Sequence, residues 1–251
     1  MSSIGSRNRD ERPTLRQAAL IAGLGYILMP VSFAEFYIFP KLVIRGNIEQ
    51  TAHNIVADGR LFVVAILCYL ITLILDVVIA WALYILLAPV NRSVSLLTAW
   101  FRLVYTVIAL VGLLNLTTVY RMLNNPDYAS AFEPRQLHAQ VMLLLNSYRY
   151  DWSVSLIIFG IHLGLLGYLV WRSGYIPKVI GVLLVVDGLG WVVQPLRPYL
   201  FPNSQLGLIL VRSFTTISFS ELILPLWLLI RGWKIQEPES IPHEVAPDPS
   251  R

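Results

Sequence analysis

Long apolar stretches separated by short polar segments dominate the sequence. A helix needs about 20 mainly apolar residues to cross the hydrocarbon core of a bilayer. Stretches that meet this length occupy residues 15–39, 61–88, 94–120, 152–171, 177–193 and 206–230. Helices are expected because an open strand would leave unpaired backbone N–H and C=O groups in lipid. The pattern therefore predicts an all-α polytopic bundle with about six crossings.

Proline and glycine separate the predicted helices. Pro89 lies in a tight turn, and Gly174 and Pro177 are placed to end one helix and open the next. We expect one transmembrane domain over residues 15–231, with disordered tails at residues 1–14, on the cytoplasmic side, and 232–251. The basic N-terminus followed by an apolar run also has features of a signal peptide, but the run continues for the length of a full span, which favours an uncleaved helix.

The connection over residues 134–150 has apolar side chains along one helical face and polar ones elsewhere. Two interpretations are open. The segment is either a helix lying in the membrane interface or an extension of the fourth span into solvent.

Composition and charge agree with the membrane prediction. Hydrophobic residues make up 56% of the chain and charged residues 14%, whereas soluble domains carry about 25% charged residues. The mean hydropathy is +0.65. The arginines are dispersed rather than clustered, which excludes a nucleic-acid surface. The four histidines have no metal-ligand spacing, and no catalytic or cofactor motif occurs.

Basic residues in short flanking segments are biased toward the side that holds the N-terminus. By the positive-inside rule we expect both termini in the cytoplasm and the chain in a bacterial cytoplasmic membrane. The expected partners are the lipid bilayer, a small molecule or ion, and a second copy of the chain.

Ionisable side chains within the predicted spans are the candidates for function, because a charge at the bilayer centre costs about 2.5–3.5 kcal/mol on insertion scales. Such side chains turn inward and find partners. They are Glu35, Asp76, Arg102, Asp187, Arg212 and Glu221.

Two of these charges are placed to meet across a helical hairpin. The tight turn at Pro89 makes the second and third spans antiparallel, so that Asp76 and Arg102 approach each other. The same logic pairs Asp187 with Arg212 at nearly the same spacing. Two inverted three-helix halves, an arrangement of many transporters, would produce this recurrence, and so would a chance likeness between unrelated hairpins.

The sixth span is polar on two sides, and Pro225 frees the carbonyl of Glu221. A carboxyl group beside a freed carbonyl suits a proton or cation site, although an ordinary proline kink explains it as well. His162 is a candidate for proton relay or ligand binding, against the simpler interpretation of a buried histidine with one hydrogen bond.

Small residues on two neighbouring spans indicate close helix packing rather than chemistry. They are Gly160, Gly164 and Gly167 on the fourth span and Gly181 and Gly188 on the fifth.

Several segments resemble one family. They are F-G-I-H-L-G-L-L-G-Y-L-V-W-R-S-G-Y-I-P-K-V-I-G-V-L-L at residues 159–184, L-Y-I-L-L-A-P-V-N-R at 83–92, F-R-L-V at 101–104 and T-A-x-x-I at 51–55. Together they resemble the bacterial membrane family called domain of unknown function 4386, over residues 16–231. The resemblance implies a multi-helix membrane protein without an assigned activity.

Three functions remain open. The first is a small-solute or ion-coupled carrier with carboxylates at the bilayer midplane. The second is a non-catalytic membrane component that assembles with other proteins or responds to envelope stress. The third is an intramembrane enzyme acting on a lipid or quinone, which no motif in the sequence supports.

Overall fold

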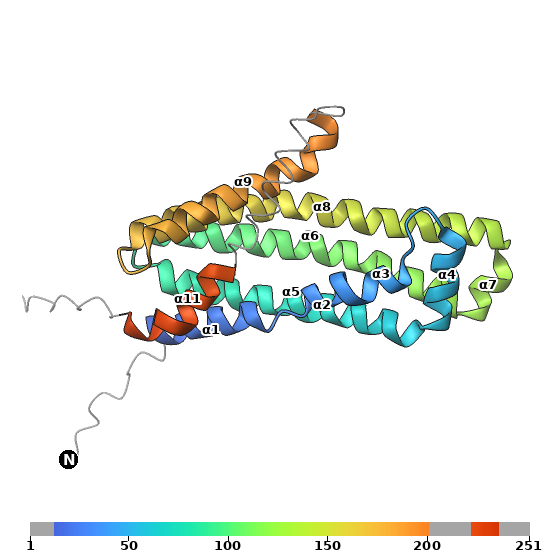
Figure 1. Cartoon of the computed structure of the whole chain (residues 1–251), viewed down its shortest axis with the longest axis horizontal. Helices are drawn as coiled ribbons and strands as arrows, with labels where there is room; N and C mark the ends of the chain where they lie inside the picture. Colours follow the sequence, from blue (N-terminus) through green and yellow to red (C-terminus); the bar gives the residue numbers. More distant parts are fainter. Residues whose placement is uncertain (1–12, 201–221, 236–251) are drawn as a thin grey trace, which may run out of the picture.

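The computed structural model describes residues 13–200 and 222–235 and shows a bundle of long helices (Figure 1). Within these ranges no strand occurs, and five helical segments are long and apolar enough to cross a membrane. The all-α polytopic prediction is confirmed. Most of the sixth predicted span lies outside the described residues, and its end forms α11 (Ile223–Arg231).

The first span is broken rather than continuous. Helix α1 (Leu15–Ile27) begins at Thr14, whose hydroxyl and Gln17 form a reciprocal capping box. The chain is interrupted before Pro30, resumes as α2 (Val31–Phe33), and passes through a π-helical turn, η1 (Ala34–Ile38), into α3 (Phe39–Leu42). Proline has no N–H to donate, so the hydrogen-bond ladder of α1 cannot continue through Pro30. The sequence pattern predicted the span but missed this break.

The central hairpin matches its prediction closely. Helix α5 (Gly59–Leu87) ends in a short turn, and α6 (Arg92–Asn124) begins where the Asn91 side chain accepts a hydrogen bond from the Val94 N–H. A short helix, α4 (Ile48–Ala57), precedes α5 and another, α7 (Pro126–Ala131), follows α6. Figure 1 shows both short helices at the same end of the bundle.

Helix α8 (Pro134–Ser173) resolves the open question over residues 134–150, because it is one continuous helix of 40 residues. At 1.5 Å per residue it is about 60 Å long, roughly twice the hydrocarbon thickness. The extension of the fourth span is therefore confirmed, and the separate interfacial helix is wrong. Gly174 ends α8 in the left-handed region at φ 75°, and α9 (Lys178–Leu200) follows.

The turns after α5 and α8 lie at one end of the bundle, where the Tyr175 hydroxyl donates a 2.5 Å hydrogen bond to the Leu86 carbonyl. The start of α1 lies at this end too. Arg16 Nε there donates to the carbonyl of Ile235, which follows the 3₁₀ turn η3 (Gly232–Lys234). We call this the turn end of the bundle.

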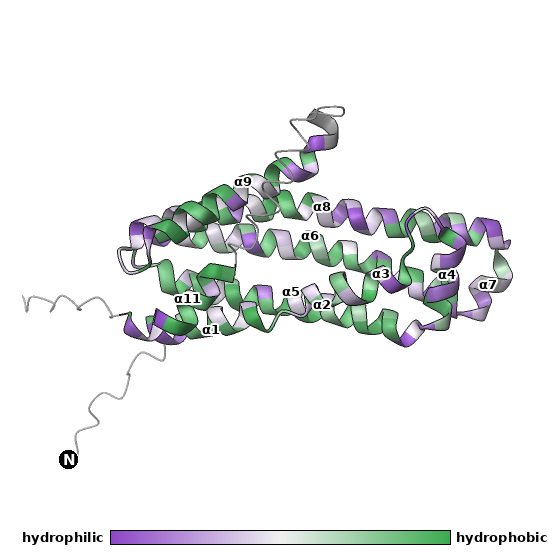
Figure 2. Cartoon of the chain, viewed as in Figure 1, coloured by the Kyte–Doolittle hydropathy of each residue, from purple (hydrophilic) through white to green (hydrophobic). Residues whose placement is uncertain are grey.

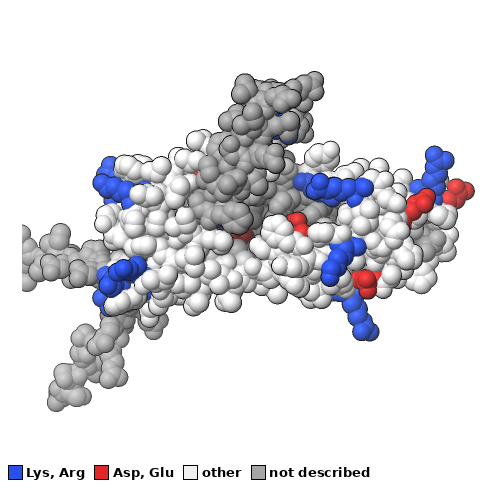
Figure 3. Space-filling view, in the orientation of Figure 1, with Lys and Arg blue, Asp and Glu red and all other residues white. Residues whose placement is uncertain are grey.

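Polarity follows the long axis of the molecule. Figure 2 shows apolar residues along the helices between the turn end and the middle of α8, with polar residues at both ends. In Figure 3 the described surface near the turn end carries basic side chains, others lie over the opposite half, and little charge lies between. About 30 Å from the turn end, α8 reaches Trp152. The rest of α8, with α4 and α7, therefore extends past the length that a 30 Å hydrocarbon core would cover from the turn end.

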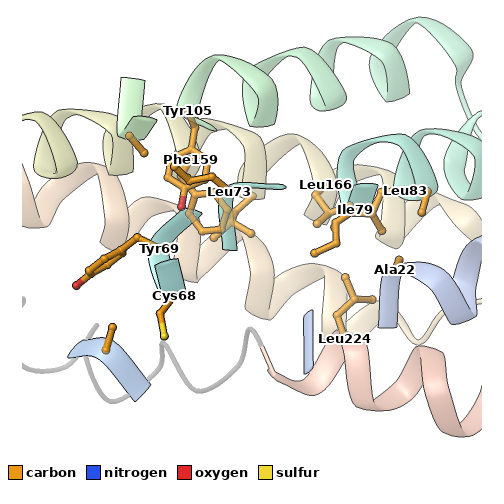
Figure 4. Packing of buried hydrophobic residues seen from close by; sticks show 14 of the residues in the cluster. Ala22, Cys68, Tyr69, Leu73, Ile79, Leu83, Tyr105, Phe159, Leu166 and Leu224 are labelled. Carbon is orange, nitrogen blue, oxygen red and sulfur yellow. The ribbon is translucent and has the colours of Figure 1, made fainter. Parts of the chain in front are cut away.

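The core is apolar and drawn from distant parts of the chain. Ile79 of α5, Leu166 of α8 and Leu224 of α11 are almost fully buried and lie in one region (Figure 4). The outward positions of the same helices are also apolar, as a lipid-facing surface requires. Burial thus follows helix–helix contact instead of a separation of polar and apolar faces.

Glycines bring α8 and α9 into close contact, as predicted. A Cβ on Gly167 would come within 2.5 Å of the Gly181 carbonyl oxygen, and one on Gly160 within 2.5 Å of the Gly188 carbonyl oxygen. Gly164 differs, since a Cβ there would meet nothing within 4 Å.

Gly167→Val should destabilise the folded bundle by about 1–3 kcal/mol, because its side chain would be forced into the backbone of α9. The thermal midpoint of the purified protein in detergent measures this effect. Gly164→Ala is the matched control and should leave the midpoint unchanged or raise it, since alanine favours helix. Equal midpoints for Gly167→Val and the wild type would contradict the packing.

Candidate functional site

Four polar side chains from four helices meet inside the apolar bundle. They are Tyr26 of α1, Asp76 of α5, Arg102 of α6 and His162 of α8, and together we call them the midplane cluster. Asp76, Arg102 and His162 each lie about 15 Å along their helices from the turn end, which is half the thickness of a hydrocarbon core. This is the depth of the bilayer centre for a hydrocarbon core that begins at the turn end.

The ion pair between Asp76 and Arg102 is short and buried. Arg102 Nη2 lies 2.5 Å from Asp76 Oδ1, and each residue is 1% exposed. The contact predicted from the α5–α6 hairpin is confirmed. A buried charge of either sign would be unfavourable alone, so each residue makes the other tolerable in this position.

His162 joins the pair through both ring nitrogens. Its Nε2 lies 3.2 Å from Arg102 Nη1, and its Nδ1 lies 2.9 Å from the Thr98 carbonyl oxygen. Arginine can only donate, so Nε2 must accept, and Nδ1 must carry the proton that it donates to Thr98. The geometry selects one neutral tautomer. His162 is therefore buried, as the simpler sequence interpretation had it, but makes two hydrogen bonds rather than one.

Tyr26 completes the enclosure of the guanidinium. Arg102 Nη1 donates to the Tyr26 hydroxyl at 2.6 Å. The guanidinium carbon also lies 4.7 Å from the Tyr26 ring centre and 5.5 Å from that of Phe159. These distances are typical of cation–π contacts, which strengthen when water is excluded. Tyr26 was not among the sequence candidates, because its only signal was a hydroxyl-bearing aromatic residue in the middle of an apolar span.

Two polar atoms of the cluster make no hydrogen bond to the residues that the structure describes. They are Asp76 Oδ2 and Arg102 Nε. Buried polar atoms are nearly always hydrogen-bonded in folded proteins. The midplane cluster therefore has one acceptor and one donor beyond what its four members use.

The contacts given above for the midplane cluster involve none of the other sequence candidates. Asp187 is buried on α9, at 1% exposure. Arg212 and Glu221 lie outside the described residues, so the Asp187–Arg212 pair, the inverted repeat and the carbonyl site at Pro225 stay predictions. Glu35 is on η1, where its Oε1 accepts a 2.5 Å hydrogen bond from the Tyr69 hydroxyl.

Glu35 also lines a cavity of about 480 Å³ between the first span and α8, which we call the η1–α8 pocket. Two arginines contribute to it, Arg45 after α3 and Arg149 of α8. Aromatic rings form part of the wall: Phe39 stacks on Tyr148 at 5.9 Å, and Tyr148 lies 6.0 Å from Trp152. Arg45 and Arg149 lie outside the predicted spans, and the pocket was not among the sequence predictions.

The described helices and the sealed charges in their interior define an integral membrane protein of the polytopic all-α class. The model of the family called domain of unknown function DUF4386 matches residues 21–232, so the chain belongs to this family. It is also 34% identical over 173 residues to an uncharacterized protein from Archaeoglobus fulgidus, covering 68% of this chain and 85% of that protein. No solved structure matches it. The resemblance found in the sequence is confirmed.

Asp76→Leu or Arg102→Met alone should lower the stability of the bundle by about 3–5 kcal/mol, because either change leaves an unpaired buried charge. The double variant removes both charges and should recover most of this loss. Folded yield and thermal midpoint in detergent measure it. Arg60→Met is the control, since Arg60 is exposed at the far end of α5. A double variant no better than the worse single one would argue against the pairing.

The tautomer of His162 can be observed directly. In protein labelled with ¹⁵N-histidine, the resonances of His162 should show a protonated Nδ1 and an unprotonated Nε2, because arginine cannot accept a hydrogen bond. His162→Gln identifies the resonances by their loss. A doubly protonated ring, or a proton on Nε2, would contradict the contact with Arg102.

Proposed function

We propose that this protein is a carrier for a small solute or ion, in a bacterial cytoplasmic membrane with both termini in the cytoplasm. Its midplane cluster acts as the closed barrier. The observation that supports this most is the make-up of the cluster: an ion pair, a histidine and a tyrosine from four helices meet inside an apolar bundle, about 15 Å along their helices from the turn end. Intramembrane charges of this kind mark ion and substrate pathways in many membrane proteins.

The broken first span supplies a means of opening the barrier. Tyr26 contacts Arg102 from α1, just before the interruption at Pro30. Discontinuous helices line the sites of many transporters, and hinges are short element ends that absorb changes in backbone angle. A tilt of α1 about this break would separate Tyr26 from Arg102. The acceptor and donor still available on Asp76 and Arg102 would then face the opening.

The orientation rests on the positions of basic residues. The turn end carries Arg16, Arg92, Arg172, Lys178 and Arg231, in short segments beside the apolar slab. Short cytoplasmic flanks carry an excess of lysine and arginine. The turn end is therefore assigned to the cytoplasm, and the projecting half of α8 to the other side.

A second candidate is a non-catalytic component of a membrane assembly. The near-complete burial of the ion pair favours it, because a purely structural pair is sealed in every state. The two candidates differ in one measurable respect: water reaches the midplane of a carrier during its cycle and never reaches that of a static bundle.

Thiol accessibility tests this difference without knowledge of the substrate. Cys68 is the chain's one cysteine, so Cys68→Ala provides a background for Thr72→Cys, a buried position one turn from Asp76. A membrane-impermeant methanethiosulfonate should label this thiol slowly in intact vesicles. Adding Tyr26→Phe removes the hydrogen bond from Arg102 to the Tyr26 hydroxyl. The labelling rate should then rise by about tenfold, which corresponds to the loss of one hydrogen bond to a charged group.

Two control cysteines, one exposed to water and one exposed to lipid, give the upper and lower limits of the labelling rate. Asp58→Cys is exposed beyond the slab and should react fast, whereas Val104→Cys is exposed toward lipid and should not react. Labelling of Thr72→Cys only after the protein has been unfolded would overturn the carrier proposal and favour the assembly component.

A further inference from the structure

The η1–α8 pocket carries charges of both signs that the midplane cluster does not use. Arg45 and Arg149 are positive, and Glu35 supplies a carboxyl group. A simple anion would meet Glu35, and a simple cation would meet two guanidinium groups. The arrangement complements a molecule that carries a phosphate and an ammonium group together, since arginine pairs with phosphate and carboxylate with ammonium.

Glu35 is held in place for such a role. The π-helical turn η1 turns it toward α5, where Oε1 accepts the hydrogen bond from Tyr69, a residue with no exposure. A carboxylate offers about four lone-pair sites, so one bond leaves most of its acceptor capacity for a ligand. π-Helical turns occur frequently at functional sites.

Aromatic rings add a second contact for the ammonium group. Phe39, Tyr148 and Trp152 line the same cavity, and the Tyr148 ring contacts each of the other two. Cations bind over aromatic faces within about 6 Å, and ring-lined pockets recognise alkylammonium groups in this way. A volume of about 480 Å³ falls within the range of about 300–1,000 Å³ that is common for small-ligand sites.

The position of the pocket indicates the source of the ligand. Trp152 lies about 30 Å along α8 from the turn end, at the far boundary of the hydrocarbon. Its neighbour Tyr150 is 65% exposed, as in the aromatic belts at membrane interfaces. Phospholipid headgroups occupy this level of a bilayer. Pro40, Val43 and Ile44 add an apolar wall suited to the glycerol and upper acyl groups.

We propose that the η1–α8 pocket binds the headgroup of a zwitterionic aminophospholipid, phosphatidylethanolamine, with Arg45 and Arg149 on the phosphate and Glu35 and the aromatic wall on the ammonium. This site goes beyond the carrier proposal and does not rest on it. A failure here would leave the thiol-labelling result at Thr72 unaffected, and the reverse also holds.

Native mass spectrometry of the full chain, released from detergent with defined lipids, tests the assignment. The wild type is offered an equimolar mixture of phosphatidylethanolamine and phosphatidylglycerol, which has a phosphate but no ammonium group. It should retain about tenfold more phosphatidylethanolamine than phosphatidylglycerol, as expected for one additional charge-assisted contact. Equal retention of the two lipids would overturn the proposal.

Two variants separate the halves of the headgroup. Arg149→Gln should lower retention of both lipids by about tenfold, and Glu35→Gln should abolish the preference between them. Arg60→Gln, an exposed arginine in the same half of the molecule but outside the pocket, should change neither. Unchanged retention in Arg149→Gln would contradict the site. Both pocket residues are exposed, so an unchanged thermal midpoint verifies that each variant is folded.

Competition with soluble O-phosphoethanolamine tests whether the ligand is a lipid or a soluble molecule. It has the same phosphate and ammonium groups without acyl chains. A lipid site predicts little displacement of phosphatidylethanolamine at millimolar concentrations, because the apolar wall contributes to binding. Full displacement would assign the pocket to a soluble metabolite and overturn the lipid assignment.

Discussion

The burial of Arg102 is the constraint on which the rest of the bundle depends. A guanidinium halfway across a bilayer is unfavourable by several kcal/mol unless its charge is neutralised and its donors are occupied. One helix cannot do this. Asp76 comes from α5, Tyr26 from α1 and His162 from α8, so the arginine determines which four helices must meet and at which height.

Around this polar centre the packing is dominated by close backbone contact. Lipid tails are as apolar as leucine, so hydrophobic burial alone does not drive one helix onto another in a bilayer. Glycines on α8 and α9 instead let the two helix backbones approach closely, which favours van der Waals contact between them. Direct polar ties such as Tyr175 to Leu86 then hold the turn end. Charge burial, small residues and these ties together give the bundle its specificity.

The long α8 divides the molecule into two regions with different chemistry. One half is enclosed by apolar residues of the bundle and contributes His162 to the sealed cluster. The other half projects with α4 and α7 and carries exposed polar groups. The η1–α8 pocket lies where the two halves meet.

Sequence alone determined the all-α polytopic class, the location of the spans that the structure describes and the partnership of Asp76 with Arg102. Each of these follows from local rules: the length of apolar runs, the cost of charge in lipid and the short turn at Pro89, which makes the neighbouring helices antiparallel. Tertiary structure alone decided the remainder: Tyr26 and His162 around the arginine, the break at Pro30 in an apparently uniform span, and the η1–α8 pocket. These depend on which faces of helices distant in sequence are brought together, and a periodicity within one helix carries no information about its neighbour's rotation.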